Sequence, residues 1–367
     1  MVADTKIEWA DHTFNPWIGC TKIGPGCDNC YAEAQNTRFK GGNWGVNADR
    51  RLTSDANWRQ PIRWNNKAEA SGIRPRVFVA SMADVFDKEV PPSWRQRLWQ
   101  LIVDTPNLDW LIVTKRIGNA PKMLPSGWLD SIPENVWIGA TVTNQEEADR
   151  DIPKLARLPA KVRFLSMEPL LGSVNLGGLS ANAGILGTLQ YNCLTPPKNE
   201  PPYFIHRHIN WVIVGGESGP NARPMHPDWA MAIKRQCKIA KIPFFFKQWG
   251  EWLPKKFADE EQMKKCRATT YINNHDQVHD DSHEVDFPST YEEVNLVGKA
   301  IAGRMLDGRK YSAVPVTQAT CSAKGIIARD SRGYGLCPHI RVGGIVCMAP
   351  AGMDCEYKQA KTCEVPE

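Results

Sequence analysis

The sequence predicts an α/β fold whose parallel β-sheet closes into a full or partial (β/α) barrel. Between about residues 75 and 250, short apolar runs rich in β-branched residues alternate with stretches compatible with helices. These runs are apolar throughout, which is typical of strands buried on both faces of a parallel sheet. A polar cluster follows each run, at the position where parallel α/β proteins carry their functional side chains.

Seven strands are expected along the chain. The first lies around Thr13 to Trp17, and the others are the apolar runs 76–80, 110–113, 136–140, 162–165, 211–214 and 243–246. Helical patterns separate them, for example at 93–103 and 228–237. Alternation of strands and helices favours a barrel, with an open doubly wound sheet as the alternative.

The chain divides into three parts by composition. Residues 1–254 form the expected barrel core, with an insertion near 173–208, and residues 255–312 form a charged insertion and closing segment. Residues 313–367 form a cysteine-rich extension that carries Cys321, Cys337, Cys347, Cys355 and Cys363. The spacing of these cysteines matches no zinc pattern, so a second metal site and free thiols both remain open.

Composition indicates a cytoplasmic protein. The 367 residues include eleven cysteines, and Met1 to Ala10 lacks the apolar segment of a signal peptide. No apolar stretch is long enough to span a bilayer, so no membrane partner is expected. In a reducing compartment, clustered cysteines more often bind metal or do redox work than form disulfides.

Three cysteines near the start carry the most specific chemical signal. Cys20, Cys27 and Cys30 follow the pattern Cys-x6-Cys-x2-Cys, and Gly24 to Gly26 supply the chain reversal between the first two. Thiolates suit iron–sulfur clusters and zinc, and three of them leave one metal position for another ligand. The alternatives are a zinc site completed by His12, or buried thiols without metal.

The runs around these cysteines resemble the cluster loop of radical S-adenosylmethionine enzymes, in particular the branch of photoproduct-lyase-like proteins. An even stronger resemblance is to a phage and prophage family of poorly defined function that carries this three-cysteine loop. It covers about residues 5 to 312, and the cysteine extension lies outside it. The resemblance rests on the segments Asn15–Ala32, Ser81–Phe86, Thr114–Arg116, Met167–Pro169 and Gly215–Gly219. The usual radical-enzyme loop has three residues between its first two cysteines, whereas this chain has six.

The resemblance implies a barrel of the radical S-adenosylmethionine type, in which the three cysteines hold a [4Fe–4S] cluster whose open iron chelates S-adenosylmethionine. Reductive cleavage would yield a 5′-deoxyadenosyl radical. Asp84, Glu168 or Glu217 would accept from the ammonium of this ligand, and Lys115 and Arg116 would bind its carboxylate. The ribose and adenine would contact the remaining candidates, Ser81, Thr141, Thr143 and Asn144 for the ribose and Tyr31 for the adenine.

A second group of residues is expected on the substrate side. Glu217 and Ser218 belong to a Gly-Gly-Glu-Ser-Gly run that follows a late strand. The alternative for Glu217 is a purely structural role near a helix N-terminus, where the helix dipole favours a negative charge. Lys247, Gln248 and Trp249 follow the last strand and are candidates to close the same side.

The favoured function is hydrogen-atom abstraction from a substrate by a radical enzyme, with isomerase, lyase and transferase outcomes left open. The resemblance and the net charge of +5 point to a nucleobase in DNA or RNA, for example a hypermodified thymidine of phage DNA. A phage-encoded protein would act in the host cytoplasm. An external flavodoxin- or ferredoxin-type donor would supply electrons. The sequence feature most similar to a nucleic-acid-binding patch is a group of arginines interleaved with Trp44, Trp58 and Trp64. The arginines are Arg50, Arg51, Arg59, Arg63, Arg74 and Arg76. The alternatives are a zinc-stabilised binding module and a hydrolase that uses the rim carboxylates.

Overall fold

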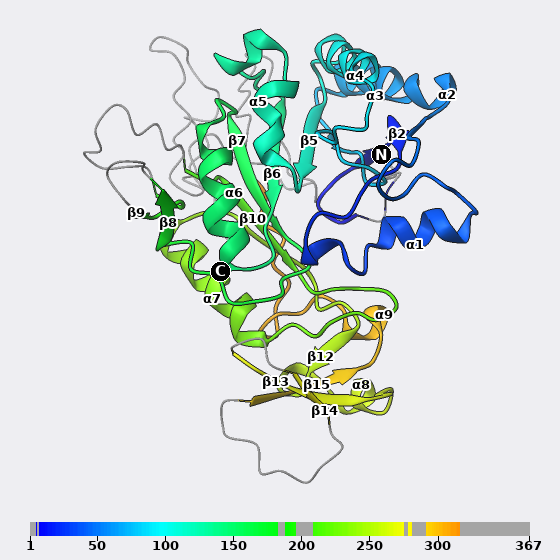
Figure 1. Ribbon diagram of the computed structural model, residues 1–367. Coiled ribbons are helices and arrows are strands. Elements are labelled where there is room, and N and C mark those ends of the chain that lie inside the picture. Colours follow the sequence, from blue (N-terminus) through cyan, green and yellow to red (C-terminus); the bar gives the residue numbers. More distant parts are fainter. Residues whose placement is uncertain are drawn as a thin grey trace, which may run out of the picture.

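The centre of the molecule is a seven-stranded parallel sheet (Figure 1). The computed structural model describes residue 5 and residues 7–182, 188–195, 208–274, 278–280 and 291–315. In spatial order the strands are β1 (His12–Phe14), β4 (Arg76–Val79), β5 (Asp109–Thr114), β6 (Val136–Thr141), β7 (Val162–Met167), β10 (Trp211–Gly215) and β11 (Phe244–Gln248). Every pairing between neighbours is parallel.

The strand order decides between the two predicted architectures. Spatial order equals chain order, so the sheet grows in one direction without the reversal that a doubly wound sheet contains. Within the described residues, the edge strands β1 and β11 do not pair with each other, so the barrel is not closed. The predicted α/β fold is confirmed as a partial (β/α) barrel, and the doubly wound alternative is wrong.

The predicted elements agree closely with the observed ones. The helices expected at 93–103 and 228–237 are α4 (Pro92–Asp104) and α7 (Pro227–Ala240). The first strand differs, because β1 ends at Phe14 and Trp17 begins the short strand β2 (Trp17–Ile18), which pairs with β3 (Arg51–Leu52). Further helices are α1 (Tyr31–Arg38), α2 (Asp55–Trp58), α3 (Gln60–Ser71), α5 (Ala120–Met123), α6 (Gln145–Arg157), α8 (Glu260–Met263) and α9 (Lys299–Ala302).

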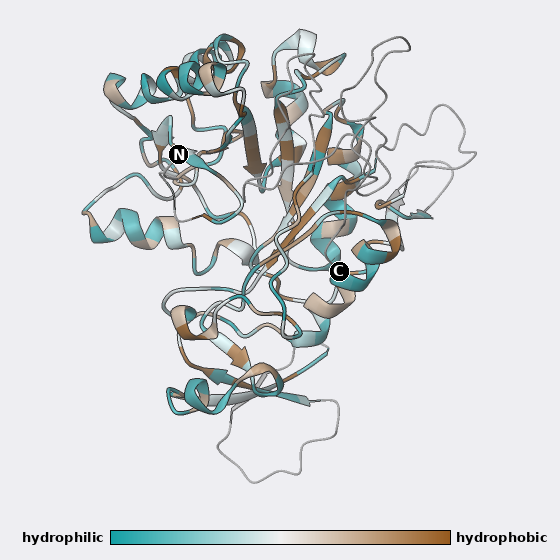
Figure 2. Cartoon of the chain, turned by 180° about the vertical axis from the view of Figure 1, so that it is seen from behind, coloured by the Kyte–Doolittle hydropathy of each residue, from teal (hydrophilic) through white to brown (hydrophobic). Residues whose placement is uncertain are grey.

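Both faces of the sheet are covered, which explains why the strands are apolar throughout. On β5, Trp110 and Ile112 belong to the large core beneath the helices, whereas Leu111 belongs to a smaller cluster on the other face. That smaller cluster also contains Trp137, Phe164 and Trp211. Figure 2 shows the resulting hydrophobic colouring along the strands. Most tryptophans in the described parts therefore fill the core, as their number predicts.

The insertions carry small antiparallel sheets of their own. A hairpin of β8 (Leu179–Asn182) and β9 (Thr188–Tyr191) lies within the predicted insertion at 173–208. A four-stranded sheet follows the barrel, in the order β12 (Trp252–Pro254), β15 (Tyr291–Leu296), β13 (Thr269–Asn273) and β14 (Val278–Asp280). The five cysteines of the predicted extension lie outside the described residues. Among the described helices, none is both long and apolar enough to traverse a bilayer.

Replacement of Gly139 tests the tight packing inside the sheet. A Cβ atom at this position of β6 would lie 2.6 Å from the Phe164 ring. We expect Gly139→Ala to lower the free energy of unfolding by about 1–3 kcal/mol, the usual cost of overpacking a core. Urea unfolding followed by tryptophan fluorescence measures this. Gly127→Ala is the matched control, because nothing lies within 4 Å of a Cβ there; equal stability of both variants would contradict the prediction.

Candidate functional site

The predicted polar clusters meet at the carboxyl edge of the sheet, and the cysteine loop lies against this edge. Cys20 follows β2, Cys27 ends a 3₁₀ turn, and Cys30 immediately precedes α1. A Cβ on Gly26 would lie 2.6 Å from Thr143 Cγ2, beyond the end of β6. The loop therefore covers the strand ends, as the sequence predicts.

The three thiols lie on one loop but do not form a compact group of ligand atoms. Cys27 is 8% exposed, and Cys20 and Cys30 are half-buried. Their sulfur atoms do not all lie within 4.8 Å of one another. A tetrahedral zinc ion with Zn–S distances of about 2.3 Å would bring its sulfur ligands to within about 4 Å of each other. The ring of His12, the predicted fourth zinc ligand, instead stacks on Trp64 at 4.2 Å.

One compact group of ligating side chains lies elsewhere, and a lysine already contacts it. The ligand atoms of His226, Asp228 and Glu292 lie within 4.8 Å of one another. Lys256 Nζ is 3.3 Å from Asp228 and 2.5 Å from Glu292. The lysine ammonium thus supplies the positive charge that these carboxylates require.

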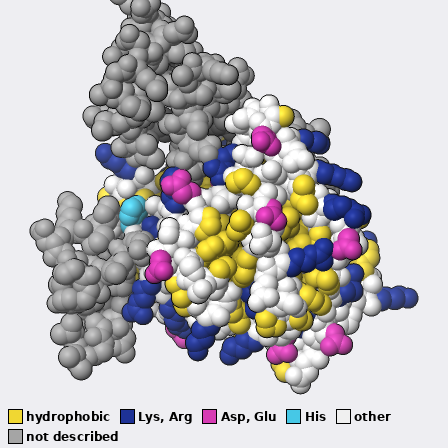
Figure 3. Space-filling model, turned by 90° about the horizontal axis from the view of Figure 1, so that it is seen from above, with side chains coloured by type: hydrophobic (Ala, Val, Ile, Leu, Met, Phe, Trp, Pro, Cys, Tyr) yellow, Lys and Arg dark blue, Asp and Glu magenta, His cyan; other side chains and the backbone are white. Residues whose placement is uncertain are grey.

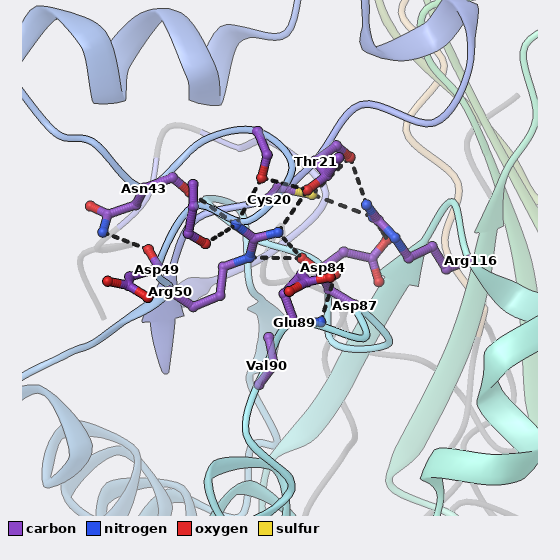
Figure 4. Close-up of polar contacts among 12 residues, drawn as sticks. Cys20, Thr21, Asn43, Asp49, Arg50, Asp84, Asp87, Glu89, Val90 and Arg116 are labelled. Carbon is purple, nitrogen blue, oxygen red and sulfur yellow. Dashed lines mark hydrogen bonds and ion pairs between the residues drawn. The ribbon is translucent and has the colours of Figure 1, made fainter.

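Arg116 contacts the first cysteine directly (Figure 4). Its Nη1 donates to Cys20 Sγ at 3.4 Å and to Asp84 at 3.2 Å, and its Nη2 donates to the carbonyl oxygen of Thr21 at 2.6 Å. Burial raises the pKa of the Cys20 thiol to about 11, although the charge of Arg116 opposes this shift. Burial alone would lower the pKa of Arg116, but Asp84 and Cys20 raise it overall. Arg116 therefore binds the cysteine loop in this structure, and the predicted contact with a ligand carboxylate stays a prediction.

Asp84 has no hydrogen-bonding capacity left for a ligand. Its carboxylate accepts from Thr114 Oγ1, from Arg116, and from the backbone N–H groups of Phe86 and Lys115. Two carboxylate oxygens offer about four acceptor positions, and four donors fill them. In this structure the aspartate orients Arg116, which favours Glu168 or Glu217 among the three residues predicted to bind the ammonium of a cosubstrate.

A second arginine supports the same segment of the loop. The side chains of Arg50 and Asp87 are 0% and 4% exposed, and they form an ion pair at 2.9 Å. Arg50 Nη2 donates to Thr21 Oγ1 at 2.7 Å, and Nη1 donates to the Ala48 carbonyl at 2.7 Å. Cys20 thus lies in a segment held by two arginines, each paired with an aspartate from the turn after β4.

These contacts also correct the predicted basic patch. Arg50 and Arg76 are buried, and Arg76 pairs with Asp11. Arg74 pairs with Asp109. Trp58 and Trp64 are buried as well, so the exposed members are Arg51, Arg59 and Arg63. Figure 3 views the molecule from above and shows Lys and Arg side chains interspersed with hydrophobic and acidic ones.

The far side of the cysteine loop is fixed by a contact that the sequence did not suggest. Arg223 donates to both oxygens of Glu217 and also to the Pro25 carbonyl at 2.7 Å and to Asp28 at 3.1 Å. Asn29 Nδ2 donates to Glu217 at 3.0 Å. Burial alone would raise the pKa of Glu217, but the hydrogen bonds from Arg223 and Asn29 lower it below its usual range. Glu217 therefore anchors the loop through Arg223 and Asn29. No sequence pattern indicated Arg223 as its partner.

Three predicted residues from two different strands form one network across β10. Glu168 accepts from Lys247 Nζ at 2.7 and 2.9 Å and from Gln248 Nε2 at 3.0 Å. Gly215 of β10 lies between them, and a Cβ there would be 3.2 Å from the Glu168 carboxyl carbon. The missing side chain thus lets Glu168 reach over β10 to β11. With two donors, this carboxylate retains acceptor capacity for a ligand.

Other predicted binding residues have local roles instead. Asn144 caps α6 by accepting from the Glu147 N–H, and Thr143 donates to Glu147 through both its N–H and its hydroxyl. Trp249 is 1% exposed and donates to the Met305 carbonyl, so it is a core residue and not a substrate contact. These are corrections to the prediction, because capping and core packing satisfy the side chains.

The remaining predicted residues differ in accessibility. Thr141 is buried at the end of β6, and Ser218 is half-buried. Ser81 Oγ accepts from Asn15 at 3.0 Å. The Tyr31 hydroxyl donates to the Ser81 carbonyl at 2.7 Å, while half of the tyrosine remains exposed. Lys115 is half-buried, and its ammonium makes no ion pair with any residue that the structure describes.

Comparison with known proteins shows the family. A family model described as "Protein of unknown function (DUF5131)" matches residues 4–315, and the chain therefore belongs to this family. The predicted phage and prophage relationship stays a prediction. No curated protein matches the chain in a sequence search.

Three solved structures of spore photoproduct lyase are similar to this chain. They are a double mutant with bound AdoMet and dinucleoside spore photoproduct, the lyase complexed with dinucleoside spore photoproduct, and a single mutant. Each is 11% identical, with a TM-score of 0.36, and the similarity covers 78% of this chain and 68% of the lyase chain.

The Glu217–Arg223 contact predicts a specific pH dependence of stability. Glu217 has a folded-state pKa below its ordinary value of 4.5, so it stabilises the fold above that pH. We expect Glu217→Gln to lose on the order of 1–3 kcal/mol at pH 7, the range for hydrogen bonds to a charged group. The deficit should shrink as the pH falls below 4.5 and through the lowered pKa.

Urea unfolding of both proteins between pH 7 and pH 3 measures this deficit. Glu261→Gln is the control, because Glu261 is 77% exposed in its pair with Lys264 and should contribute little. A Glu217→Gln deficit that is constant with pH would contradict the assignment.

Proposed function

We propose that this protein is a radical S-adenosylmethionine enzyme. The observation that carries the proposal is the set of three thiols on one loop against the carboxyl edge of an open parallel sheet. Three cysteine ligands for a [4Fe–4S] cluster leave one iron open. The motif resemblance from Asn15 to Gly219 supports the same assignment.

Cys20, Cys27 and Cys30 would hold the cluster. When bound, such a cluster supplies the electron for reductive cleavage of S-adenosylmethionine, and the resulting radical abstracts a hydrogen atom from the substrate. The chain contributes ligands, orientation and charge around this chemistry.

Hydrogen-bonding capacity selects among the predicted cosubstrate-binding residues. Asp84 has its acceptor positions filled and Glu217 already accepts four hydrogen bonds, whereas Glu168 accepts from two donors and can take another. Glu168 is therefore the best acceptor for the ligand ammonium. Arg116 is engaged by the cysteine loop, which leaves Lys115 as the better cation for the carboxylate.

We propose a nucleobase in DNA as the substrate, with thymidine hypermodification in phage DNA as the specific form. The motif resemblance to photoproduct-lyase-like proteins and the net charge of +5 support this class. Nucleic-acid binding depends on several cations on one surface, for which Arg51, Arg59 and Arg63 are the exposed candidates. A flavodoxin- or ferredoxin-type protein is the proposed electron donor.

The rival functions receive less support from the geometry. A hydrolase needs a carboxylate free to act as acid or base, but each carboxylate named at the rim pairs with a cation: Asp84 with Arg116, Glu168 with Lys247, and Glu217 with Arg223. A zinc module would need His12 beside the cysteines, whereas its ring stacks on Trp64.

Anaerobic reconstitution tests the proposed function. We expect about four irons and four sulfides per chain, their loss in a Cys20/Cys27/Cys30→Ala variant, and 5′-deoxyadenosine on addition of dithionite and S-adenosylmethionine. Cys237→Ala is the matched control, because this thiol is buried on α7 away from the loop. Stoichiometric zinc without iron would refute the proposal.

Glu168→Gln tests the cosubstrate assignment separately from the cluster. The substitution keeps the shape of the side chain and removes one charged acceptor, so we expect unchanged iron content. Affinity for S-adenosylmethionine should fall about 10- to 100-fold, the equivalent of a charge-assisted hydrogen bond of about 1.5–3 kcal/mol. Calorimetry on the reconstituted protein measures it, with Glu261→Gln as the exposed control. Unaltered affinity would move the ammonium site away from Glu168.

A further inference from the structure

The three cysteines have unequal surroundings. Cys20 Sγ receives a hydrogen bond from the Arg116 guanidinium at 3.4 Å. Within the described residues, no side chain donates a hydrogen bond to the sulfur of Cys27 or Cys30. The positive charge of Arg116 therefore acts on one side of the loop.

The position of Arg116 is determined by groups around it rather than by its own flexibility. Nη2 bonds the Thr21 carbonyl at 2.6 Å, so the fork spans the sulfur and the backbone of consecutive residues. Asp84 binds Nη1 at 3.2 Å and is itself fixed by Thr114 Oγ1 at 2.8 Å. The Arg116 side chain is only 9% exposed, which limits screening of its charge by water.

The same short segment, Cys20–Thr21, is also held by contacts that do not involve Arg116. Arg50 bonds Thr21 Oγ1, and the Gly45 N–H donates to the Cys20 carbonyl at 2.9 Å. Figure 4 shows both arginines between this segment and the turn that contains Asp84 and Asp87, with which they form ion pairs. Cys20 and Arg116 are thus kept at a fixed separation by contacts independent of any bound group.

We propose that Arg116 is a positioning residue that raises the reduction potential of the cluster through its hydrogen bond to Cys20. The inference rests on the proposed function. One-electron reduction makes a cluster more negative by one unit, so a nearby cation and an N–H donor to sulfur stabilise the reduced form more than the oxidised form. Asp84 weakens the effect, because its negatively charged carboxylate accepts from the same guanidinium nitrogen that donates to Cys20.

Two substitutions should shift the potential in opposite directions. Arg116→Gln removes the cation, so we expect the ratio of reduced to oxidised cluster at a fixed solution potential to fall about tenfold, equal to about 59 mV for one electron. Arg116→Lys keeps the charge but loses the guanidinium group that donates two hydrogen bonds. Its reduction potential should lie between that of the wild type and that of Arg116→Gln. Asp84→Asn removes a negative charge beside Arg116 and should raise the potential above that of the wild type.

Redox titration of the anaerobically reconstituted chain, followed by absorption and electron paramagnetic resonance, measures these potentials alongside iron and sulfide content. Arg63→Gln, an exposed arginine on α3, is the matched control and should leave the potential unchanged. A fully loaded Arg116→Gln protein with the wild-type potential would overturn the inference and leave the cluster site intact. If that variant does not load, an Asp84→Asn potential at or below the wild-type value overturns it. Wild-type protein without iron would instead refute the proposed function.

Discussion

The buried ion pair between Arg50 and Asp87 is the interaction on which the arrangement of the site depends. Neither side chain is accessible to water, so removal of one partner would leave an uncompensated charge, which typically costs about 3–5 kcal/mol. Arg50 also bonds Thr21 and the Ala48 carbonyl. The pair therefore joins the turn after β4 to the cysteine loop and fixes the loop against the sheet edge.

Other charged side chains at this edge of the sheet are also paired with opposite charges. Each carboxylate named at the rim pairs with a cation, and the pair of Glu168 and Lys247 joins residues from two different segments across β10. Such pairs hold neighbouring strand ends in register with the loop above them. The hydrogen bonds are unevenly distributed, because Asp84 accepts from four donors and orients Arg116, whereas Glu168 accepts from two.

The sheet could be predicted from the sequence because burial on both faces leaves uninterrupted apolar runs such as Trp110–Val113. The cysteine loop could also be predicted, because its ligands lie close together in the chain. The hydrogen-bond and ion-pair partners of the polar residues could not be predicted from the sequence. Arg223 and Asp28 are 195 residues apart, and nothing in either local sequence specifies the contact. Asn144 and Trp249 looked accessible because they follow strands, but helix capping and core packing use them instead.

The hydrogen bond between Arg223 and the Pro25 carbonyl has a consequence for the order in which the chain folds. It joins residues 198 positions apart, so the loop that carries the cysteines is made early in synthesis but acquires its anchor only after β10 has been added. Contacts of such long range form late, because closing the chain between them costs entropy first. We expect the cysteine thiols to stay accessible to solvent until the segment that follows β10 docks against the loop.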